Sequence, residues 1–155
     1  MLTVWFPITE STVNNGCLAV VPRSHRDELV LHCRSRDPLI QNQVCIPERL
    51  VQGEQVPLPM QPGDVLFMHR CTQHSGLPNR SHDIRWSFDL RYHVIGAPTG
   101  RPWFPGFIAR SRAHPDRELR DPDKWAQLWR NARTHLATGK EVQFNRWATD
   151  DQRCA

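Results

Sequence analysis

The segment from Ile84 to Tyr92 alternates strictly between apolar and polar side chains, and this pattern constrains the fold more than any other part of the sequence. A period of two is typical of a β-strand, because successive side chains point to opposite faces of a sheet. One face carries Ile84, Trp86, Phe88, Leu90 and Tyr92, and the other carries Arg85, Ser87, Asp89 and Arg91. We expect the apolar face to be buried, and the polar face to line the inside of a barrel.

Arg85 and Ser87 lie two residues apart on the polar face of this strand. A guanidinium offers a planar fork of donors, so an arginine beside a hydroxyl can hold a carboxylate in a bidentate manner. The alternative is an arginine on an edge strand with its charged head in water. The aromatic and apolar residues that follow Arg85 favour the first interpretation.

The rest of the sequence up to about Val94 also reads as a series of strands. Asn14-Asn15-Gly16 is a strong turn signal between the first two strands, and Pro62-Gly63-Asp64 is a turn into a later one. We therefore predict a mainly β protein. The expected strands are Leu2 to Ile8, Cys17 to Val21, the weaker segments Gln43 to Ile46 and Gln55 to Leu58, Val65 to His69, and Ile84 to Val94.

The pattern changes after Gly96. The segment Arg101 to Phe107 is rich in proline and aromatic residues, and we expect it to pack as a lid or brace over the barrel. Asp121 is a good N-cap with Pro122 at the first helical position, so a helix should run to about Ala137. We expect the apolar stripe of this helix to pack on a core. The stripe consists of Trp125, Leu128, Trp129 and Ala132.

This change of pattern also suggests how the chain is organised. We predict a core of residues 1–110 and a helical extension of residues 111–155 packed on it.

Composition narrows the classes of partner. The 155 residues carry a net charge of +4 that comes almost wholly from arginine, because Lys124 and Lys140 are the only lysines. No dense basic stripe is interleaved with aromatics, which disfavours nucleic-acid binding. Dispersed arginines instead favour anionic small molecules such as an acyl-CoA or a keto-acid.

The five cysteines are odd in number and form no CxxC pair, which argues against a zinc ribbon and a disulfide framework. We expect reduced thiols in a cytoplasmic protein. The sequence has no run of about 18 apolar residues that would span a membrane. The first residues do not show a basic n-region followed by an apolar h-region, so we expect neither a secretory signal in this segment nor a membrane partner.

Several segments together resemble the C-terminal half of the phytanoyl-CoA dioxygenase (PhyH) family of Fe(II)/2-oxoglutarate-dependent oxygenases. They are Val4 to His25, the GDVLF strand from Gly63, the histidine His74 and the Arg85-x-Ser87 pair, and the resemblance covers most of residues 3 to 110. It implies a double-stranded β-helix, or jelly roll, with Fe(II) as cofactor and 2-oxoglutarate as cosubstrate. The implied activity is hydroxylation of a small-molecule or acyl-CoA-type substrate.

The resemblance also implies a role for four residues. His74 matches the distal histidine of a 2-His-1-carboxylate iron site, a geometry that leaves open positions on the metal. Arg85 would bind the far carboxylate of 2-oxoglutarate, Ser87 would support it, and Trp5 would line the pocket. Without the resemblance, His74 reads as a surface residue at a strand end and Trp5 as core packing.

The other two iron ligands of the family come from an H-x-D motif upstream of the segment that Trp5 opens, and this sequence has no such motif there. We expect a fragment or alternative start of a longer oxygenase, or a chain that has lost its chemistry. His25-Arg26-Asp27 has the right order for a triad but matches a turn that follows the metal strand, and His114-Pro115-Asp116 reads as a turn.

Two alternatives to an active oxygenase follow from the missing motif. One is an inactive jelly roll that binds a keto-acid or an acidic metabolite through Arg85, and the other is a structural or partner-binding cupin-like domain. An incomplete jelly roll would have open sheet edges, through which a homo-oligomer could form.

Two further histidines have ordinary interpretations. His69 alternates with Val65 and Phe67, so its side chain is expected to reach the barrel interior as a core histidine or as a donor to the metal site. His82 lies in a polar loop, where exposure is expected.

Overall fold

The computed structural model describes residues 1–35, 44–99, 103–139 and 151–154. The chain forms two compact units, one of Met1–Tyr92 together with Trp147–Ala155 and one of His93–Arg146. The first unit holds all the described strands, and the second holds the long helix. The predicted packing of an extension of residues 111–155 on a core of residues 1–110 stays a prediction.

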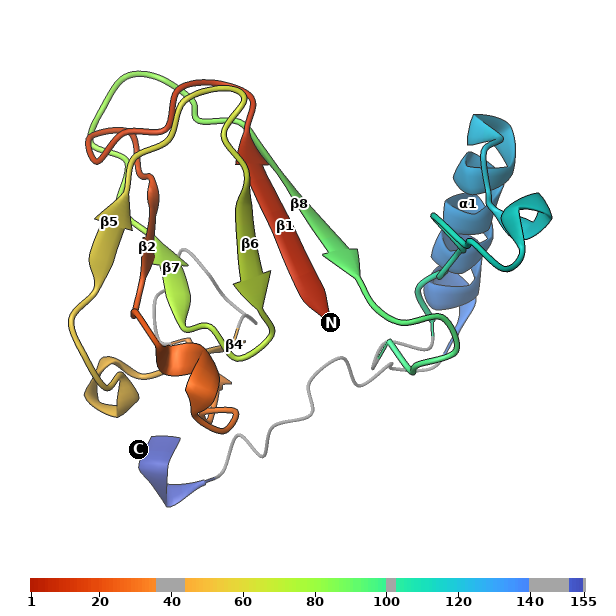
Figure 1. The fold of residues 1–155 in the computed structure, drawn as a ribbon. Helices are drawn as coiled ribbons and strands as arrows, with labels where there is room; N and C mark the ends of the chain where they lie inside the picture. Colours follow the sequence, from red (N-terminus) through yellow and green to blue (C-terminus); the bar gives the residue numbers. More distant parts are fainter. Residues whose placement is uncertain (36–43, 100–102, 140–150, 155) are drawn as a thin grey trace. The chain divides into compact units, whose positions relative to one another are not determined.

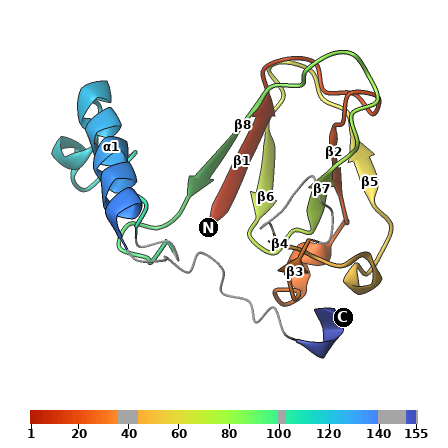
Figure 2. The same cartoon turned by 180° about the vertical axis from the view of Figure 1, so that it is seen from behind.

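The first unit contains two antiparallel sheets of three strands each, and Figures 1 and 2 show them from opposite sides. The first sheet has the order β6-β1-β8, and the second has the order β5-β2-β7. A small third sheet pairs β3 with β4. The strands are β1 (Leu2–Pro7), β2 (Leu18–Val20), β3 (Cys33–Arg34), β4 (Val44–Cys45), β5 (Val56–Leu58), β6 (Leu66–His69), β7 (His74–Gly76) and β8 (Ser87–Tyr92).

The connections between the two larger sheets define a jelly roll. The chain passes from one sheet to the other between β1 and β2, and again at each step from β5 through β8. This alternation is the double-stranded β-helix topology, so the predicted fold class is confirmed. The sequence missed β3 and β7, each of which is too short to show a period.

The core lies between the two sheets. Trp5 on β1, Met68 on β6 and Leu18 on β2 form a buried cluster, so side chains from both sheets meet there. Thr3 and Trp5 therefore mark the inner face of β1. Directly opposed residues on neighbouring strands share a face, so the register with β1 assigns the faces of β6 and β8.

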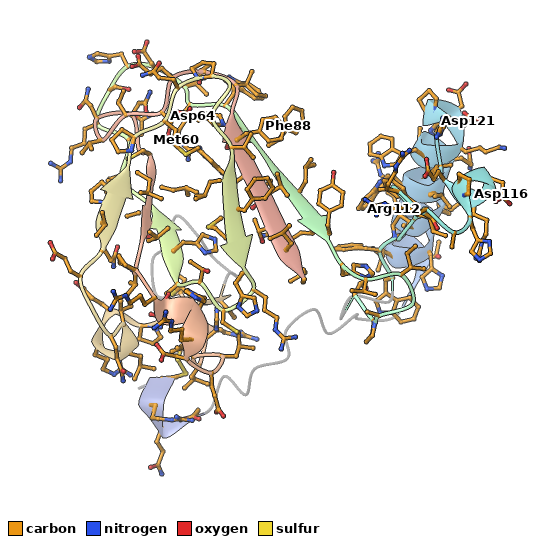
Figure 3. All side chains as sticks on the ribbon, in the orientation of Figure 1. Met60, Asp64, Phe88, Arg112, Asp116 and Asp121 are labelled. Carbon is orange, nitrogen blue, oxygen red and sulfur yellow. A yellow bond between two sulfur atoms is a disulfide. The ribbon has the colours of Figure 1, made fainter. Side chains whose placement is uncertain are left out.

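This register contradicts the prediction that the apolar face of β8 is buried. Trp5 lies opposite Asp89 and Pro7 lies opposite Ser87, so the polar residues of β8 occupy the inner face. Phe88 is 50% exposed, and Figure 3 shows its side chain directed away from the other sheet. The alternation is correct, but within the described part of the first unit the side chains of the outer face stay exposed. The exposed apolar residues of this strand and its approach are Ile84, Trp86, Phe88, Leu90 and Tyr92.

The prediction that His69 reaches the interior is also wrong. Leu66 and Met68 face the core, whereas Val65, Phe67 and His69 fall on the opposite face of β6. His69 is exposed. The polar loop containing His82 is exposed, as expected.

The turn before β2 is confirmed. Gly16 has a φ of 85°, and Asn15 fixes the turn by accepting a hydrogen bond from the Thr12 N–H at 2.7 Å. A β-carbon at Gly16 would lie 2.6 Å from the carbonyl oxygen of Leu77, so only glycine fits. Leu77 in turn donates its N–H to Cys17 at 2.9 Å, which joins this turn to the end of β7.

The described residues of the first unit also include short 3-10 helices. They are η1 (Ser24–Arg26), η3 (Glu48–Leu50) and η5 (Gln152–Cys154). Ser24 in η1 is 3% exposed, and its hydroxyl accepts a hydrogen bond from the Gln73 N–H at 2.9 Å. This contact ties η1 to the start of β7.

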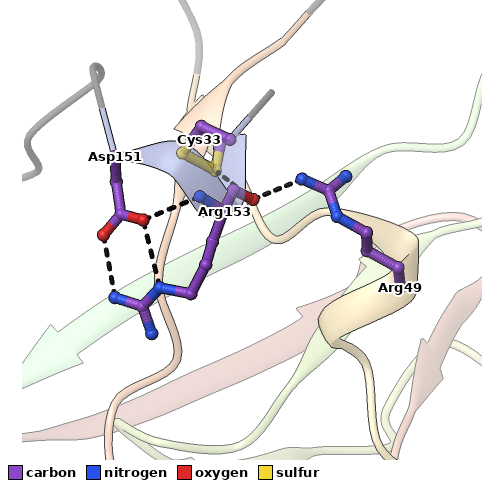
Figure 4. Close-up of polar contacts among 5 residues, drawn as sticks. Cys33, Arg49, Asp151 and Arg153 are labelled. Carbon is purple, nitrogen blue, oxygen red and sulfur yellow. Dashed lines mark hydrogen bonds and ion pairs between the residues drawn. A yellow bond between two sulfur atoms is a disulfide. The ribbon is translucent and has the colours of Figure 1, made fainter.

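A disulfide joins Cys33 on β3 to Cys154 in η5, with a Cα–Cα separation of 5.4 Å. The prediction that every cysteine is a reduced thiol is therefore wrong for these two, and the cysteine pattern gives no support to a cytoplasmic location. Sequence spacing could not reveal the pair because the two cysteines are 121 positions apart. Arg49 donates a hydrogen bond to the carbonyl of Arg153, and the Arg153 side chain pairs with Asp151 (Figure 4).

The second unit contains η4 (Pro115–Arg117) and the helix α1 (Pro122–Thr138). Asp121 caps α1 as predicted, because its carboxylate accepts from the N–H groups of Asp123 and Lys124 at 2.9 and 3.2 Å. Among the described residues, no helix combines the length and apolar character needed to cross a membrane.

Within the second unit, the aromatic stripe of α1 is only partly covered. No residue of α1 is buried, and Trp125 and Trp129 are 46% and 40% exposed. The segment expected to act as a brace contacts this helix, since Phe104 lies against Trp129 with ring centroids 5.8 Å apart and Trp103 stacks on His135 at 4.8 Å. Its expected packing over the barrel stays a prediction.

Candidate functional site

Arg85 is held at three points on the inner side of the first unit. Its Nε donates to the carbonyl of Gly16 at 2.8 Å, and its Nη1 donates to the hydroxyl of Ser87 at 3.0 Å. Its guanidinium carbon lies 5.5 Å from the centroid of the Trp5 ring, within the range of a cation–π contact. The structure therefore brings together three of the residues that the sequence singled out: Arg85, Ser87 and Trp5.

The local folding explains this convergence. Ser87 faces inward because it lies opposite Pro7 on β1, and Trp5 is the next inward residue along β1. The positive φ at Gly16 places its carbonyl at the Arg85 side chain. Trp5 is 4% exposed, so it serves the core and the site together.

The remaining nitrogen of the guanidinium, Nη2, is the donor that a ligand can use. No ion pair or hydrogen bond joins Nη2 to another residue in the described part of the chain, and no described carboxylate neutralises Arg85. Nη2 lies 3.9 Å from where a β-carbon would stand at Gly76 on β7. A half-buried cation with an open donor beside a residue without a side chain is suited to a small anion.

His74 is the first residue of β7 and pairs with Val20 on β2, so it shares the face that carries the core residues. It is exposed, and its Nδ1 lies 2.9 Å from the carbonyl oxygen of Thr72. A carbonyl oxygen can only accept, so Nδ1 carries the proton of this hydrogen bond. In the neutral ring, Nε2 is then left with its lone pair free to bind a metal ion.

His74 and Arg85 point toward the same part of the inner surface. His74 lies two residues before Gly76 on the same face of β7, which is about 7 Å along the strand. Gly76 is the residue that Nη2 of Arg85 approaches. His74 and the guanidinium of Arg85 therefore both lie beside the inner face of β7.

The described residues do not assemble a complete metal site. No group of three or more His, Cys, Asp or Glu side chains comes together in a metal-binding arrangement within those ranges. His25 packs edge-on against His69, with ring centroids 6.3 Å apart. The turn at His114-Pro115-Asp116 belongs to the other unit, where Pro115 begins η4.

Four positioning residues were missed by sequence reasoning. Gly16 was recognised as a turn residue, but nothing in the sequence showed that its carbonyl would hold Arg85. Gly76 leaves space beside that arginine, Thr72 orients the ring of His74, and Ser24 anchors the strand that carries it. These contacts depend on the pairing of distant segments.

The fold and the site define a jelly-roll protein with a fixed arginine and a strand-end histidine on its inner face. A sequence model of the phytanoyl-CoA dioxygenase (PhyH) family matches residues 1–87, which is more than half of the chain. The chain therefore belongs to the PhyH family.

Two curated relatives are similar to part of the chain. The dioxygenase lolE1 of Epichloe uncinata is 27% identical over 93 residues, covering 59% of this chain and 33% of the relative. A methylphosphonate hydroxylase of Gimesia maris is 30% identical over 95 residues, covering 61% of this chain and 34% of the relative. The chain thus spans about a third of the length of these relatives.

Two solved structures of EvdO2 from Micromonospora carbonacea var. aurantiaca also resemble the chain, one of them complexed with 2-oxoglutarate. Each is 25% identical with a TM-score of 0.46, and the match covers 66% of this chain and 43% of EvdO2.

Proposed function

We propose that this chain carries the cosubstrate-binding half of an Fe(II)/2-oxoglutarate-dependent oxygenase. The observation that supports the proposal most is the state of Arg85, which is anchored by Gly16 and Ser87 while its Nη2 stays open. An arginine fixed in this way loses little freedom on binding, which favours a carboxylate over a diffuse anion.

In this proposal, the far carboxylate of 2-oxoglutarate binds Nη2 of Arg85 and the hydroxyl of Ser87. Ser87 already accepts a hydrogen bond from Arg85, so its own proton is available to the ligand. The buried ring of Trp5 keeps water from one side of the guanidinium, which strengthens the ion pair. The keto end of the ligand would then extend along β7 toward His74.

The fit to iron is partial. The free Nε2 of His74 is suitable as a ligand, but the described residues supply no second or third ligand beside it. A ferrous ion needs several ligands for affinity and geometry, so the other ligands would come from outside the described arrangement. Bound iron would supply the activation of oxygen, while this chain would bind and orient the cosubstrate.

The substrate we propose is a small molecule, with an acyl-CoA-type compound included in that class. One relative is named for methylphosphonate, a small anion. The net charge of +4 on this chain is consistent with an anionic substrate. The reaction would be hydroxylation, as in the name of that relative.

A second candidate function is metal-independent binding of a keto-acid or acidic metabolite. The incomplete ligand set among the described residues favours it, because the anion site around Arg85 is formed without a metal. Binding would then be indifferent to Fe(II). The loss of His74 would also leave it unchanged.

Anaerobic titration with Fe(II) and 2-oxoglutarate separates these functions. The oxygenase proposal predicts the visible absorption of a keto-acid chelated to ferrous ion, lost in His74→Ala and in Arg85→Ala. Binding of 2-oxoglutarate without this absorption supports the metal-independent function. A folded chain that shows neither contradicts both proposals and leaves the structural role.

A further inference from the structure

Three cysteines of the first unit lie close to one another. Cys33 on β3 is linked to Cys154 in η5, with their Cα atoms 5.4 Å apart. Cys45 on β4 lies directly opposite Cys33 in the register of the small two-stranded sheet. Cys33 therefore has two neighbours that can share its disulfide, and the structure shows one of these two pairings.

The strand pairing places Cys45 at a distance that suits a disulfide with Cys33. Directly opposed residues of an antiparallel pair have Cα atoms about 4.5 or 5.5 Å apart, and disulfides form at Cα separations of roughly 4.4 to 6.8 Å. Opposed residues also share a face of the sheet, so both side chains leave it on the same side. The disulfide can thus pass from Cys154 to Cys45 while β3 and β4 stay paired.

The two partners of Cys33 differ in their chemical state. Cys45 is an exposed free cysteine, whereas Cys33 is 3% exposed and already oxidised. A disulfide rearranges when a thiolate attacks one of its sulfur atoms, and the register sets Cys45 against the Cys33 end of the bond. The two remaining free cysteines, Cys17 and Cys71, lie on neither β3 nor β4.

We propose that Cys33, Cys45 and Cys154 form a disulfide exchange site, in which Cys45 replaces Cys154 as the partner of Cys33. The thiolate of Cys45 attacks the Sγ of Cys33, the bond to the Sγ of Cys154 breaks, and Cys154 leaves as a thiolate that takes up a proton. The proton lost by Cys45 balances the proton gained by Cys154, and one disulfide is present before and after. The exchange needs no oxidant or reductant, and it does not depend on the oxygenase proposal.

The exchange releases η5 from its covalent link to β3. Arg49 in η3 donates a hydrogen bond to the carbonyl of Arg153, and after the exchange η5 is held by noncovalent contacts of this kind (Figure 4). Arg153 also lines a cavity of about 280 Å³, together with Leu31 and Leu50. Detachment of η5 removes one wall of this cavity, so the exchange acts as a switch on this side of the first unit.

Mapping the disulfide and the free thiols in one sample tests the proposal. The folded, oxidised chain is incubated at mildly alkaline pH, where thiolates are present, and is then unfolded in acidic denaturant that contains excess maleimide. Mass spectrometry of the unreduced digest should find peptides linked through Cys33 and Cys45, with maleimide on Cys154 instead of Cys45. The number of labelled cysteines should stay at three, which distinguishes exchange from reduction.

Cys71→Ser is the matched control, because it removes a free cysteine that lies on neither strand of the pair. This variant should exchange as wild type does, whereas Cys45→Ser should keep the link from Cys33 to Cys154. After incubation, hydrogen exchange in the peptide that contains η5 should be faster in wild type than in Cys45→Ser. Circular dichroism before and after incubation checks that the fold is kept.

Two results would overturn the proposal. One is a folded chain in which the link between Cys33 and Cys154 is absent at the start or never passes to Cys45. The other is a link from Cys33 to Cys71 that forms as fast as the link to Cys45, because general scrambling would then explain the exchange.

Discussion

At the scale of single residues, Gly16 connects the fold to the site. It has a φ of 85°, its carbonyl holds Arg85, and a β-carbon there would lie 2.6 Å from the Leu77 oxygen. We expect Gly16→Ala to destabilise the first unit by about 3 kcal/mol, the sum of left-handed strain and a clash with backbone. Chemical denaturation measures this loss.

The control for Gly16 is Gly63, which has a φ of 103° and no atom within 4 Å of a β-carbon. Gly63→Ala should lower the free energy of unfolding only by the backbone strain at this position, about 1 to 2 kcal/mol. Equal losses in the two variants would show that the contact with Leu77 is unimportant.

Asp151 provides a pH-dependent contribution at the same scale. Hydrogen bonds from the Arg153 side chain, and then from its backbone N–H, lower the pKa of Asp151 from 3.8 to about 2. Because the folded pKa is depressed, the stabilisation is complete well above 3.8 and is lost as the pH falls toward 2. The free energies of unfolding of wild type and Asp151→Asn, measured by chemical denaturation, should therefore differ near neutral pH and become equal in strong acid. A difference that stays constant over this range would contradict the account.

The pKa of Glu118, in the second unit, is also lowered. The backbone N–H of Ser111 donates to its carboxylate at 2.9 Å, and Arg120 donates at 2.7 Å. These bonds, the first being the larger cause, lower the pKa of Glu118. Its charge is thus retained further into acid than that of an unpaired glutamate.

At the scale of elements, the helix α1 depends on its N-cap residue, Asp121. Asp121→Ala removes the acceptor for two backbone N–H groups and should destabilise the helix by about 1 kcal/mol. Asp116→Ala is the control, because η4 has no side-chain cap and this change removes a carboxylate of the same charge. Thermal melting followed by circular dichroism near 222 nm compares them. Equal melting temperatures in the two variants would show that the cap is dispensable.

Elements also show what sequence can and cannot predict. The period of β8 and the cap of α1 are local signals, and both were found. Alternation gives a strand two faces, but only the pairing of Trp5 with Asp89 decides which face is inside. For this reason the outward direction of Phe88 was missed. The short strand β7 has no period of its own and exists because it pairs with β2.

In the candidate site, too, some residues could be predicted from local sequence, while the contacts that hold them depend on the fold. Arg85, Ser87 and Trp5 could be named in advance, since they lie in motifs that resemble a family. Their supports could not, because the hydrogen bond from Arg85 to Gly16 spans 69 positions and arises only from the fold.

At the scale of the whole molecule, the disulfide between Cys33 and Cys154 closes a long loop of chain. Such a link restricts the unfolded chain, and its loss should cost about 2 to 4 kcal/mol. We expect reductant to destabilise wild type by this amount and to leave Cys154→Ser unaffected. Cys45→Ser, which changes an exposed free cysteine, should behave as wild type. If reductant has no effect on wild type, the link does not stabilise the fold.

At the same scale, we propose that Arg85 makes the inner surface of the first unit selective for a carboxylate. Calorimetric titration with 2-oxoglutarate, first without metal and then with Fe(II) under anaerobic conditions, measures this selectivity. We predict saturable binding that Arg85→Ala weakens by about tenfold to a hundredfold, the cost of losing a charge-assisted hydrogen bond. Arg80→Ala, an exposed arginine in the loop before β8, should bind as wild type does. Binding that is equal in Arg85→Ala and wild type, or absent under both conditions, would contradict the account.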